Sequence, residues 1–411
     1  MKKTLAAVAV LGAFAAGSVA AADVTLYGVV DYSLKYSRVD SDKANEDAVN
    51  NFEMASGAQS GSRFGLKGVE DLGNGMKVGF VLENGFSADD GSLLQGSRLF
   101  GRESQVFVNG AFGEVSFGRV GQLVSGNGTY GLMGDISPFG ASWAGAVEPS
   151  TYMVGYGRFD NTITYKSPEF AGARIYAQYS FDVNTKDEQN VKDDQKNVIS
   201  SLSHTEGKTT ANRYAAVGAT YQLGGLSLVA AADWYNWSDN WDKTYNSATE
   251  SWNHVDGKDS DDGYTFTLGG SYNFQVVKAY LSAQYYDNMY AKGSSEGDKY
   301  TAVADYLGSD QFKGYSVIAG VNAPLGGGLG MFAVGYADLE DCDDPADAGK
   351  KKTEVQRLGA SIGYDYPLSK RTNVYSVLSY SKDKLENEGN VAGADRDPTT
   401  TILWVGMRHK F

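Results

Sequence analysis

The chain has 411 residues and a formal net charge of −14 at pH 7; glycine occurs 51 times and tyrosine 27 times, but proline only 7 times. Such an acidic balance argues against nucleic acid as a partner, because nucleic-acid binding needs a basic face. The single cysteine, Cys342, cannot form an internal disulfide, and its acidic neighbours would raise the pKa of its thiol, which argues against a catalytic role.

Residues 1–22 have the features of a secretory signal peptide. Lys2 and Lys3 supply the positive start, 5–16 form a short apolar run, and 18–22 are small residues that suit cleavage within about 20–22. The apolar run is too short for a membrane-spanning helix. Losing the two lysines takes the net charge from −14 to −16 in a mature single domain, 23–411.

From Asp23 onward, apolar and polar residues alternate in many short runs, for example over 30–36, 264–274, 315–322 and 357–365. In the first run Tyr32 and Leu34 share one side. This alternation predicts β-strands with one apolar and one polar face. A soluble sandwich with one wet face would show the same pattern.

The lengths of the connections separate these possibilities. Seven are tight turns, at 72–75, 110–113, 167–172, 224–225, near 275, 324–328 and 367–371. Eight are long and polar, at 37–60, 87–97, 118–158, 182–212, 238–262, 288–313, 338–353 and 382–398. Turns and long loops alternate, so they join sixteen strands with every long loop at one end. This predicts an all-β fold, a transmembrane antiparallel up-and-down barrel, because in lipid a sheet satisfies its backbone only by closing.

The loop at about 119–158 is the most distinctive connection. Compact domains rarely contain so long an insertion unless it is functional. We expect this loop to fold into the lumen and narrow a water-filled channel.

Aromatic residues recur near the ends of the predicted strands, as expected of the interfacial girdles of a membrane barrel. The predicted lipid-facing set is Tyr27, Phe86, Tyr179, Phe181, Tyr221, Trp234, Tyr272, Phe274, Tyr285, Tyr364 and Tyr380.

Four motifs in order resemble the general diffusion porins of Gram-negative outer membranes. They are Val-Thr-Leu-Tyr-Gly at 24–28, Ser-Arg-Phe-Gly-Leu-Lys-Gly at 62–68 with its following turn, the run 161–172, and the ending 406–411. The resemblance covers the whole mature chain. It implies a homotrimer of sixteen-stranded barrels in the outer membrane, amid lipid and lipopolysaccharide, with the third external loop folded inward. It also implies that the terminal Phe411 is read by the barrel-assembly machinery.

The resemblance further implies a constriction between basic residues on the wall and acids on the inward loop. Arg63, Arg102 and Arg158 stand at the family's wall positions, and Arg98 and Lys35 are weaker candidates near the rim. The loop acids are Asp135, the better candidate, and Glu148. Each of these residues could also be an ordinary solvated charge.

Catalytic and metal-binding motifs do not emerge from the sequence. His204, His254 and His409 have no metal-ligand spacing, and no nucleophile turn or phosphate loop occurs, so no enzyme activity, metal or cofactor is predicted. The acidic runs 182–194, 256–262 and 338–344 could bind divalent cations or bridge lipopolysaccharide. They lack calcium-loop offsets, which favours plain solvated loops.

Three functions remain open. The leading one is passive diffusion of ions and small hydrophilic solutes through a porin. The second is a substrate-selective channel, for example for organic anions bound by the arginines. The third is a surface receptor or adhesin that acts through its long loops.

Overall fold

In the computed structural model, the described residues are 23–151, 157–186, 188–192, 198–203, 206, 211–237, 243–246, 251–254, 261–290, 311–342, 353–387 and 395–411. The predicted signal peptide, 1–22, lies outside them.

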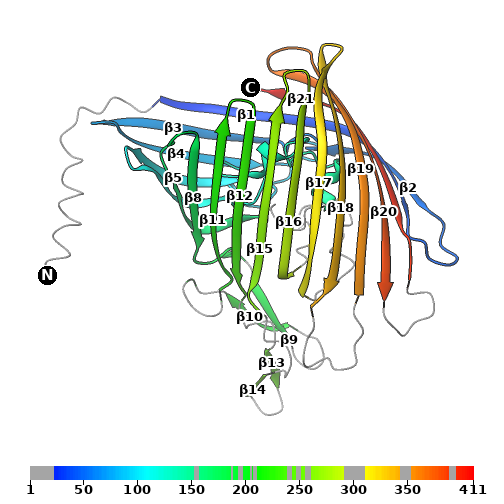
Figure 1. Cartoon of the computed structure of the whole chain (residues 1–411). Helices are drawn as coiled ribbons and strands as arrows, with labels where there is room; N and C mark the ends of the chain where they lie inside the picture. Colours follow the sequence, from blue (N-terminus) through cyan, green and yellow to red (C-terminus); the bar gives the residue numbers. More distant parts are fainter. Residues whose placement is uncertain are drawn as a thin grey trace.

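The described strands form a closed antiparallel barrel with sixteen wall positions (Figure 1), which confirms the predicted fold. The wall strands are β1 (Asp23–Asp40), β2 (Val49–Ser56) with β3 (Arg63–Gly73), β4 (Met76–Gly85), β5 (Glu103–Gly110), β6 (Gly113–Gly121), β7 (Arg158–Lys166), β8 (Ala173–Ser180), β11 (Arg213–Leu223), β12 (Leu226–Asn236), β15 (Gly263–Asn273), β16 (Lys278–Tyr290), β17 (Gln311–Leu325), β18 (Gly328–Asp341), β19 (Thr353–Pro367), β20 (Thr372–Asn387) and β21 (Thr399–Lys410). Each wall position pairs with the next one along the chain, and β1 pairs with β21 to close the barrel.

The second wall position is one strand in two pieces. The first part of β1 pairs with β3 and its last part with β2. Between these pieces, 57–62 turn inward, and the buried Asp31 carboxylate accepts the backbone N–H groups of Gln59 at 3.0 Å and Ser60 at 2.7 Å. The prediction of one loop over 37–60 is therefore wrong, because these residues contain the end of β1 and all of β2.

The seven predicted tight turns are confirmed, and they all lie at one end of the barrel. The long connections leave from the other end, where they carry two small hairpins not foreseen in the sequence. These are β9 (Glu188–Lys192) with β10 (Val198–Ser203), and β13 (Lys243–Asn246) with β14 (Ser251–His254), drawn beyond the lower end of the barrel in Figure 1.

The outward face is apolar, as the alternation predicts. Leu34 in β1, Leu268 in β15 and Val405 in β21 are all exposed, whereas the inward neighbours Lys35 and Thr267 are buried. One predicted lipid-facing residue is wrong: the Tyr27 hydroxyl donates to Glu83 Oε2 at 2.9 Å inside the lumen.

The C-terminal strand finishes against the first strand. Phe411 and Gly28 exchange two backbone hydrogen bonds of 3.1 Å. A Cβ at Gly28 would lie 2.2 Å from Cζ of Phe411, so the missing side chain makes room for the terminal ring. Leu403, Val405, Met407 and Phe411 are all exposed on one face of β21 and its end, as expected for contact with lipid.

The long connection between β6 and β7 is the inward loop, residues 122–157. It carries two short helices, η2 (Met133–Ile136) and α2 (Val147–Thr151), which the sequence did not predict. No helix among the described residues is long and apolar enough to cross a membrane.

Candidate functional site in the lumen

The described part of the inward loop runs along the inside of the barrel from β8 to β21. Near its start, Leu123 N donates to the Gln178 side chain of β8 at 3.2 Å. Further along, Trp143 packs edge-on against Tyr375 of β20, with ring centroids 5.3 Å apart. Ala144 N donates to Ala58 O at 2.7 Å, which joins the loop to the inward turn at 57–62. The loop is therefore docked on the wall rather than suspended across the lumen.

Wall glycines receive the side chains of this loop. At each of these positions an added Cβ would lie within 2.7 Å of a loop atom. The pairs are Gly218 with Leu132, Gly269 with Ile136, Gly320 with Pro138, Gly335 with Thr151, Gly359 with Val147, and Gly363 with Phe139. These glycines lie in five wall strands, β11, β15, β17, β18 and β19. The loop side chains occupy the space that a side chain would take at these positions. We call these six glycines the glycine seat.

The two predicted loop acids have opposite environments. Asp135 is exposed in η2, where an acid can face the lumen water. Glu148 is completely buried, and its Oε1 accepts the Ser137 hydroxyl at 2.8 Å and the Phe139 N–H at 2.7 Å. The prediction of Glu148 as an acid facing the pore is therefore wrong, because its carboxylate holds the loop together from inside.

Burial also changes the titration of Glu148. Removal from water raises the pKa of its carboxyl to about 7, although the hydrogen bonds from Phe139 and Ser137 act in the opposite direction. Its other oxygen, Oε2, has no hydrogen-bond partner in the described part of the chain.

Arg63 and Arg102 converge on one carboxylate that the sequence interpretation missed. Arg102 Nε lies 2.7 Å from Glu83 Oε1, and Arg63 Nε lies 3.5 Å from Glu83 Oε2. Two guanidinium groups thus share one negative charge on the inner wall, which leaves this group with a net charge of +1. The arginines were predicted together; Glu83 had no signal beyond lying on the polar face of its strand.

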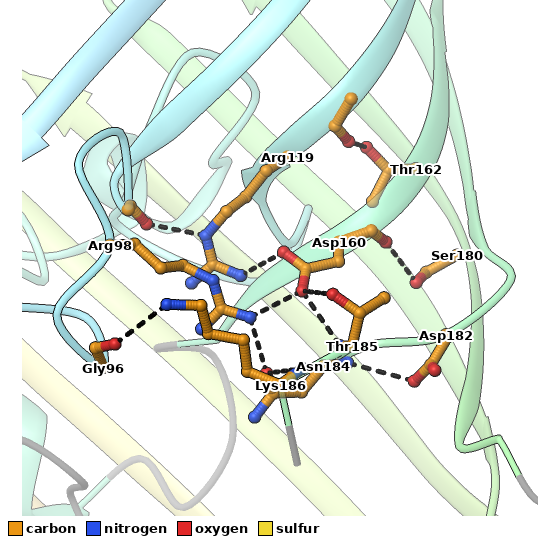
Figure 2. Close-up of polar contacts among 12 residues, drawn as sticks. Gly96, Arg98, Arg119, Asp160, Thr162, Ser180, Asp182, Asn184, Thr185 and Lys186 are labelled. Atoms are coloured by element: carbon orange, nitrogen blue, oxygen red, sulfur yellow. Dashed lines mark hydrogen bonds and ion pairs between the residues drawn. The ribbon is translucent and has the colours of Figure 1, made fainter. Parts of the chain in front are cut away.

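A second group of the same composition lies where β6 and β7 meet the inward loop (Figure 2). Arg98 Nη2 lies 2.7 Å from Asp160 Oδ2, and Arg119 Nη1 lies 2.6 Å from Asp160 Oδ1. Asp160 Oδ2 also accepts the backbone N–H and the hydroxyl of Thr185 at 3.0 and 2.9 Å. Arg98 Nη2 also donates to Asn184 at 2.8 Å. One carboxylate therefore links four segments of the extracellular end.

A β-bulge sets this geometry. Gly118 pairs with Thr162 and Val120 with Phe159, so Arg119 lies opposite two residues, Asp160 and Asn161. Asn161 adopts a positive φ of 51°, a conformation that asparagine tolerates better than most residues. Bulges redirect side chains in this way. Arg119 and Asp160 were both missed as site residues, because period-two alternation does not reveal a bulge.

The remaining predicted cations lie near other carboxylates. Lys35 is buried, with Nζ 2.9 Å from Glu53 Oε1 and 5.2 Å from the centre of the Trp404 ring. Arg158 is half-buried at the start of β7, and its charge acts on Glu103, whose carboxylate accepts the Thr129 N–H at 2.6 Å.

Nothing in the described chain suggests another kind of centre. No group of His, Cys, Asp and Glu in it could hold a metal ion. A hollow of about 660 Å³ lies over β8 to β17, but exposed apolar side chains such as Ile175, Phe266 and Leu268 line it, so it belongs to the outer, lipid-facing wall.

Comparison with known proteins agrees with this architecture. The family profile of Gram-negative porins matches residues 6–386. An outer membrane porin protein of Bordetella pertussis is 33% identical over 431 aligned residues, and outer membrane porin protein 32 of Delftia acidovorans is 30% identical over 424; each alignment covers 100% of both chains. The solved structure of an anion-selective porin from Comamonas acidovorans superposes with a TM-score of 0.60 at 28% identity, covering 95% of this chain and 100% of that one.

Proposed function

The chain belongs to the Gram-negative porin family and forms a channel across the outer membrane, and we propose that this channel passes small hydrophilic solutes with a weak preference for anions. The observation that carries this preference is the repeated pairing of two arginines with one carboxylate. Arg63 and Arg102 share Glu83, and Arg98 and Arg119 share Asp160. Each group therefore brings two positive charges and one negative charge to the inner wall.

The exposed Asp135 on the loop opposes this excess without cancelling it. One unit charge acting across about 8 Å of water contributes about 0.5 kcal/mol, a factor of two to three in ion preference. Two such charges bias permeation but do not make a tight site, which suits a channel whose solutes must leave as readily as they enter. The solved relative named as anion-selective supports the same sign.

A substrate-selective channel for organic anions stays the alternative. The same arginines would then bind one solute well enough to block the current in a saturable way. The adhesin alternative predicts a folded barrel whose loops mediate attachment and whose lumen does not conduct.

Three features of assembly belong to the same proposal. Residues 1–22 direct export and are cleaved, the barrels associate as homotrimers amid lipopolysaccharide, and Phe411 is the signal to the barrel-assembly machinery. The fit of the Phe411 ring over Gly28 supports a constrained C-terminus. A change of Phe411→Ala should therefore lower the yield of folded trimer.

Single-channel recording in a planar bilayer tests the proposed preference. The wild type should conduct in three equal steps, with a reversal potential under a KCl gradient that indicates anion preference. Arg63→Ala/Arg102→Ala should move this preference toward cations by about four- to ninefold, two factors of two to three. Adding Arg158→Ala tests the third predicted wall position.

The matched control is Lys382→Ala/Lys384→Ala, which removes two positive charges from exposed ion pairs on β20. It should leave the reversal potential unchanged. Equal ion selectivity in the wild type, the arginine variant and the lysine control would show that Arg63 and Arg102 do not set the ion preference. The proposed channel itself would not be contradicted. A folded barrel without conductance would favour the adhesin.

A further inference from the structure

We propose that the lumen has a second anion-binding site at its periplasmic mouth, separate from the arginine groups of the constriction. The inference rests on the proposed channel function and extends it. The site is a pocket of about 310 Å³ between the turn that joins β17 to β18, the turn that joins β19 to β20, and the end of β21. Short turns mark the periplasmic end of an outer-membrane barrel.

Four basic residues line this pocket: Lys370 and Arg371 in the turn, and Arg408 and Lys410 on β21. Lys370, Arg371 and Lys410 are exposed and Arg408 is half-buried. Among the described residues, none of the four makes an ion pair with a carboxylate; Arg408 Nε donates instead to the neutral Asn373 side chain at 3.1 Å. Their charges are therefore available to a solute.

The single acid of the pocket is already engaged. Asp365 Oδ1 accepts Asn373 Nδ2 at 2.6 Å, and Asp365 Oδ2 accepts Gln59 Nε2 at 2.8 Å. Four positive charges and one negative charge give the pocket a net charge of +3. An anion entering it gains Coulomb attraction and meets guanidinium donors suited to carboxylate or phosphate oxygens.

The pocket has a fixed frame. Lys410 N donates to Arg371 O at 2.8 Å, which ties the end of β21 to the turn, and Ser369 Oγ accepts the backbone N–H groups of Arg371 at 3.1 Å and Thr372 at 3.0 Å. The backbones that carry Arg371 and Lys410 are thus held beside each other before any ligand arrives, which lowers the entropic cost of binding.

The site is also continuous with the constriction. Val29 of β1 pairs with Lys410 on one side and with Arg63 on the other. Lys410 and Arg63 are therefore separated by one strand on the inner wall, and Arg63 shares Glu83 with Arg102. Anions that pass the arginine groups meet the pocket next. Its ligand class is a small free multivalent anion, such as phosphate or a dicarboxylate.

Phosphate block of chloride current tests the proposal. Wild-type channels in a zwitterionic bilayer receive inorganic phosphate on one side at a time. Half-block should need less phosphate on one side than on the other. Arg371→Gln/Arg408→Gln/Lys410→Gln should raise the half-block concentration on the sensitive side about tenfold, since each charge contributes a factor of two to three. The asymmetry between the sides should then disappear.

The matched control removes three basic residues from the same end of the barrel but outside the pocket. Lys77, Arg174 and Lys278 lie in the first two residues of β4, β8 and β16. Their glutamine triple variant should keep both the asymmetry and the half-block concentration within twofold. An equal shift in both triple variants, or none in the pocket variant, would overturn the site.

Two further measurements keep the outcome decisive. Chloride conductance without phosphate reports the channel itself, so its loss in the wild type would contradict the proposed function rather than the pocket. If the triple variant does not fold, Lys410→Gln alone should shift half-block about twofold; an unchanged value would then overturn the proposal.

Discussion

The two halves of the inner wall differ in the kind of contact that their side chains make. From β8 to β21 the wall is covered by the inward loop, and six of its glycines receive loop side chains. From β3 to β7 the wall bears arginines that share carboxylates. The covered half is specified by shape, whereas the half from β3 to β7, which we call the charged half, is specified by charge.

This difference assigns stability and selectivity to separate regions. A close-packed surface is sensitive to a single added methylene, because interiors have few voids. One unit charge acting across about 8 Å of water contributes only about 0.5 kcal/mol, yet this interaction is what a permeating ion senses. Changes in the covered half should therefore alter the folding and width of the channel, and changes in the charged half should alter its ion preference.

The largest effect is expected when two glycines that receive loop side chains are replaced by a large residue. In Gly218→Leu/Gly359→Leu, the new Cβ atoms would lie 2.7 Å from Leu132 Cδ1 and 2.7 Å from Val147 Cγ2. Overpacking costs about 1–3 kcal/mol at each site, so the variant should lose up to about 6 kcal/mol in urea unfolding. The displaced loop has only the lumen to move into, so single-channel conductance should fall while ion preference is kept.

Gly330→Leu is the matched control on the same sheet. Its new Cβ would have no neighbour nearer than 3.5 Å, and it faces away from the inward Met331 because successive side chains alternate. This variant should conduct like the wild type. Wild-type stability and conductance in the double variant would show that the loop does not depend on the glycines.

The second test removes the shared carboxylate Asp160 of the charged half. Asp160→Asn leaves Arg98 and Arg119 close together without the anion that both contact. Breaking one partner of a buried charge group costs about 4 kcal/mol, which urea unfolding should register. Anion preference should rise at the same time.

Two comparisons isolate the cause of that loss. Removing the whole group in Arg98→Met/Arg119→Met/Asp160→Asn should restore most of the stability, because no unpaired charge remains. Asp397→Asn breaks an exposed ion pair with Lys382, whose side chain is 52% exposed, and should leave the unfolding free energy close to that of the wild type. If the triple variant is as unstable as Asp160→Asn, desolvated charge is not the reason.

The same contrast explains what could be predicted from sequence. Alternation and turn length are local, so the barrel, its sixteen wall positions and its seven turns follow from short stretches of chain. Arg63 and Arg102 were identified because they lie in recognisable strand motifs. The glycine seat leaves no such signal, because an absent side chain does not indicate which distant residue fills its place.

The missed and misplaced residues depend on irregular backbone. Arg119 meets Asp160 through a bulge at Asn161, and Lys35 meets Glu53 on β2, a stretch predicted as loop. Glu148 was misplaced for a related reason. An acid in a long polar loop is expected to be exposed, and only the folded path of the loop brings Ser137 and Phe139 to it.

The third test measures how the unfolding free energy depends on pH through Glu148, a residue buried in the inward loop. Burial raises the pKa of this carboxyl from an ordinary 4.5 to about 7, so between these values the folded protein holds a proton that the unfolded chain has lost. Stability should therefore fall as pH rises from 4.5 to 7 and level off above 7, a loss of about 3 kcal/mol, since one unit of pKa corresponds to about 1.36 kcal/mol.

Subtracting the unfolding free energy of Glu148→Gln from that of the wild type at pH 5, 6, 7 and 8 isolates this contribution. Glu169→Gln, which removes an exposed acid paired with Arg174, should keep the wild-type pH dependence. A pH-independent difference between wild type and Glu148→Gln would mean that the charged carboxylate is tolerated inside the docked loop, and that shape alone holds the covered half.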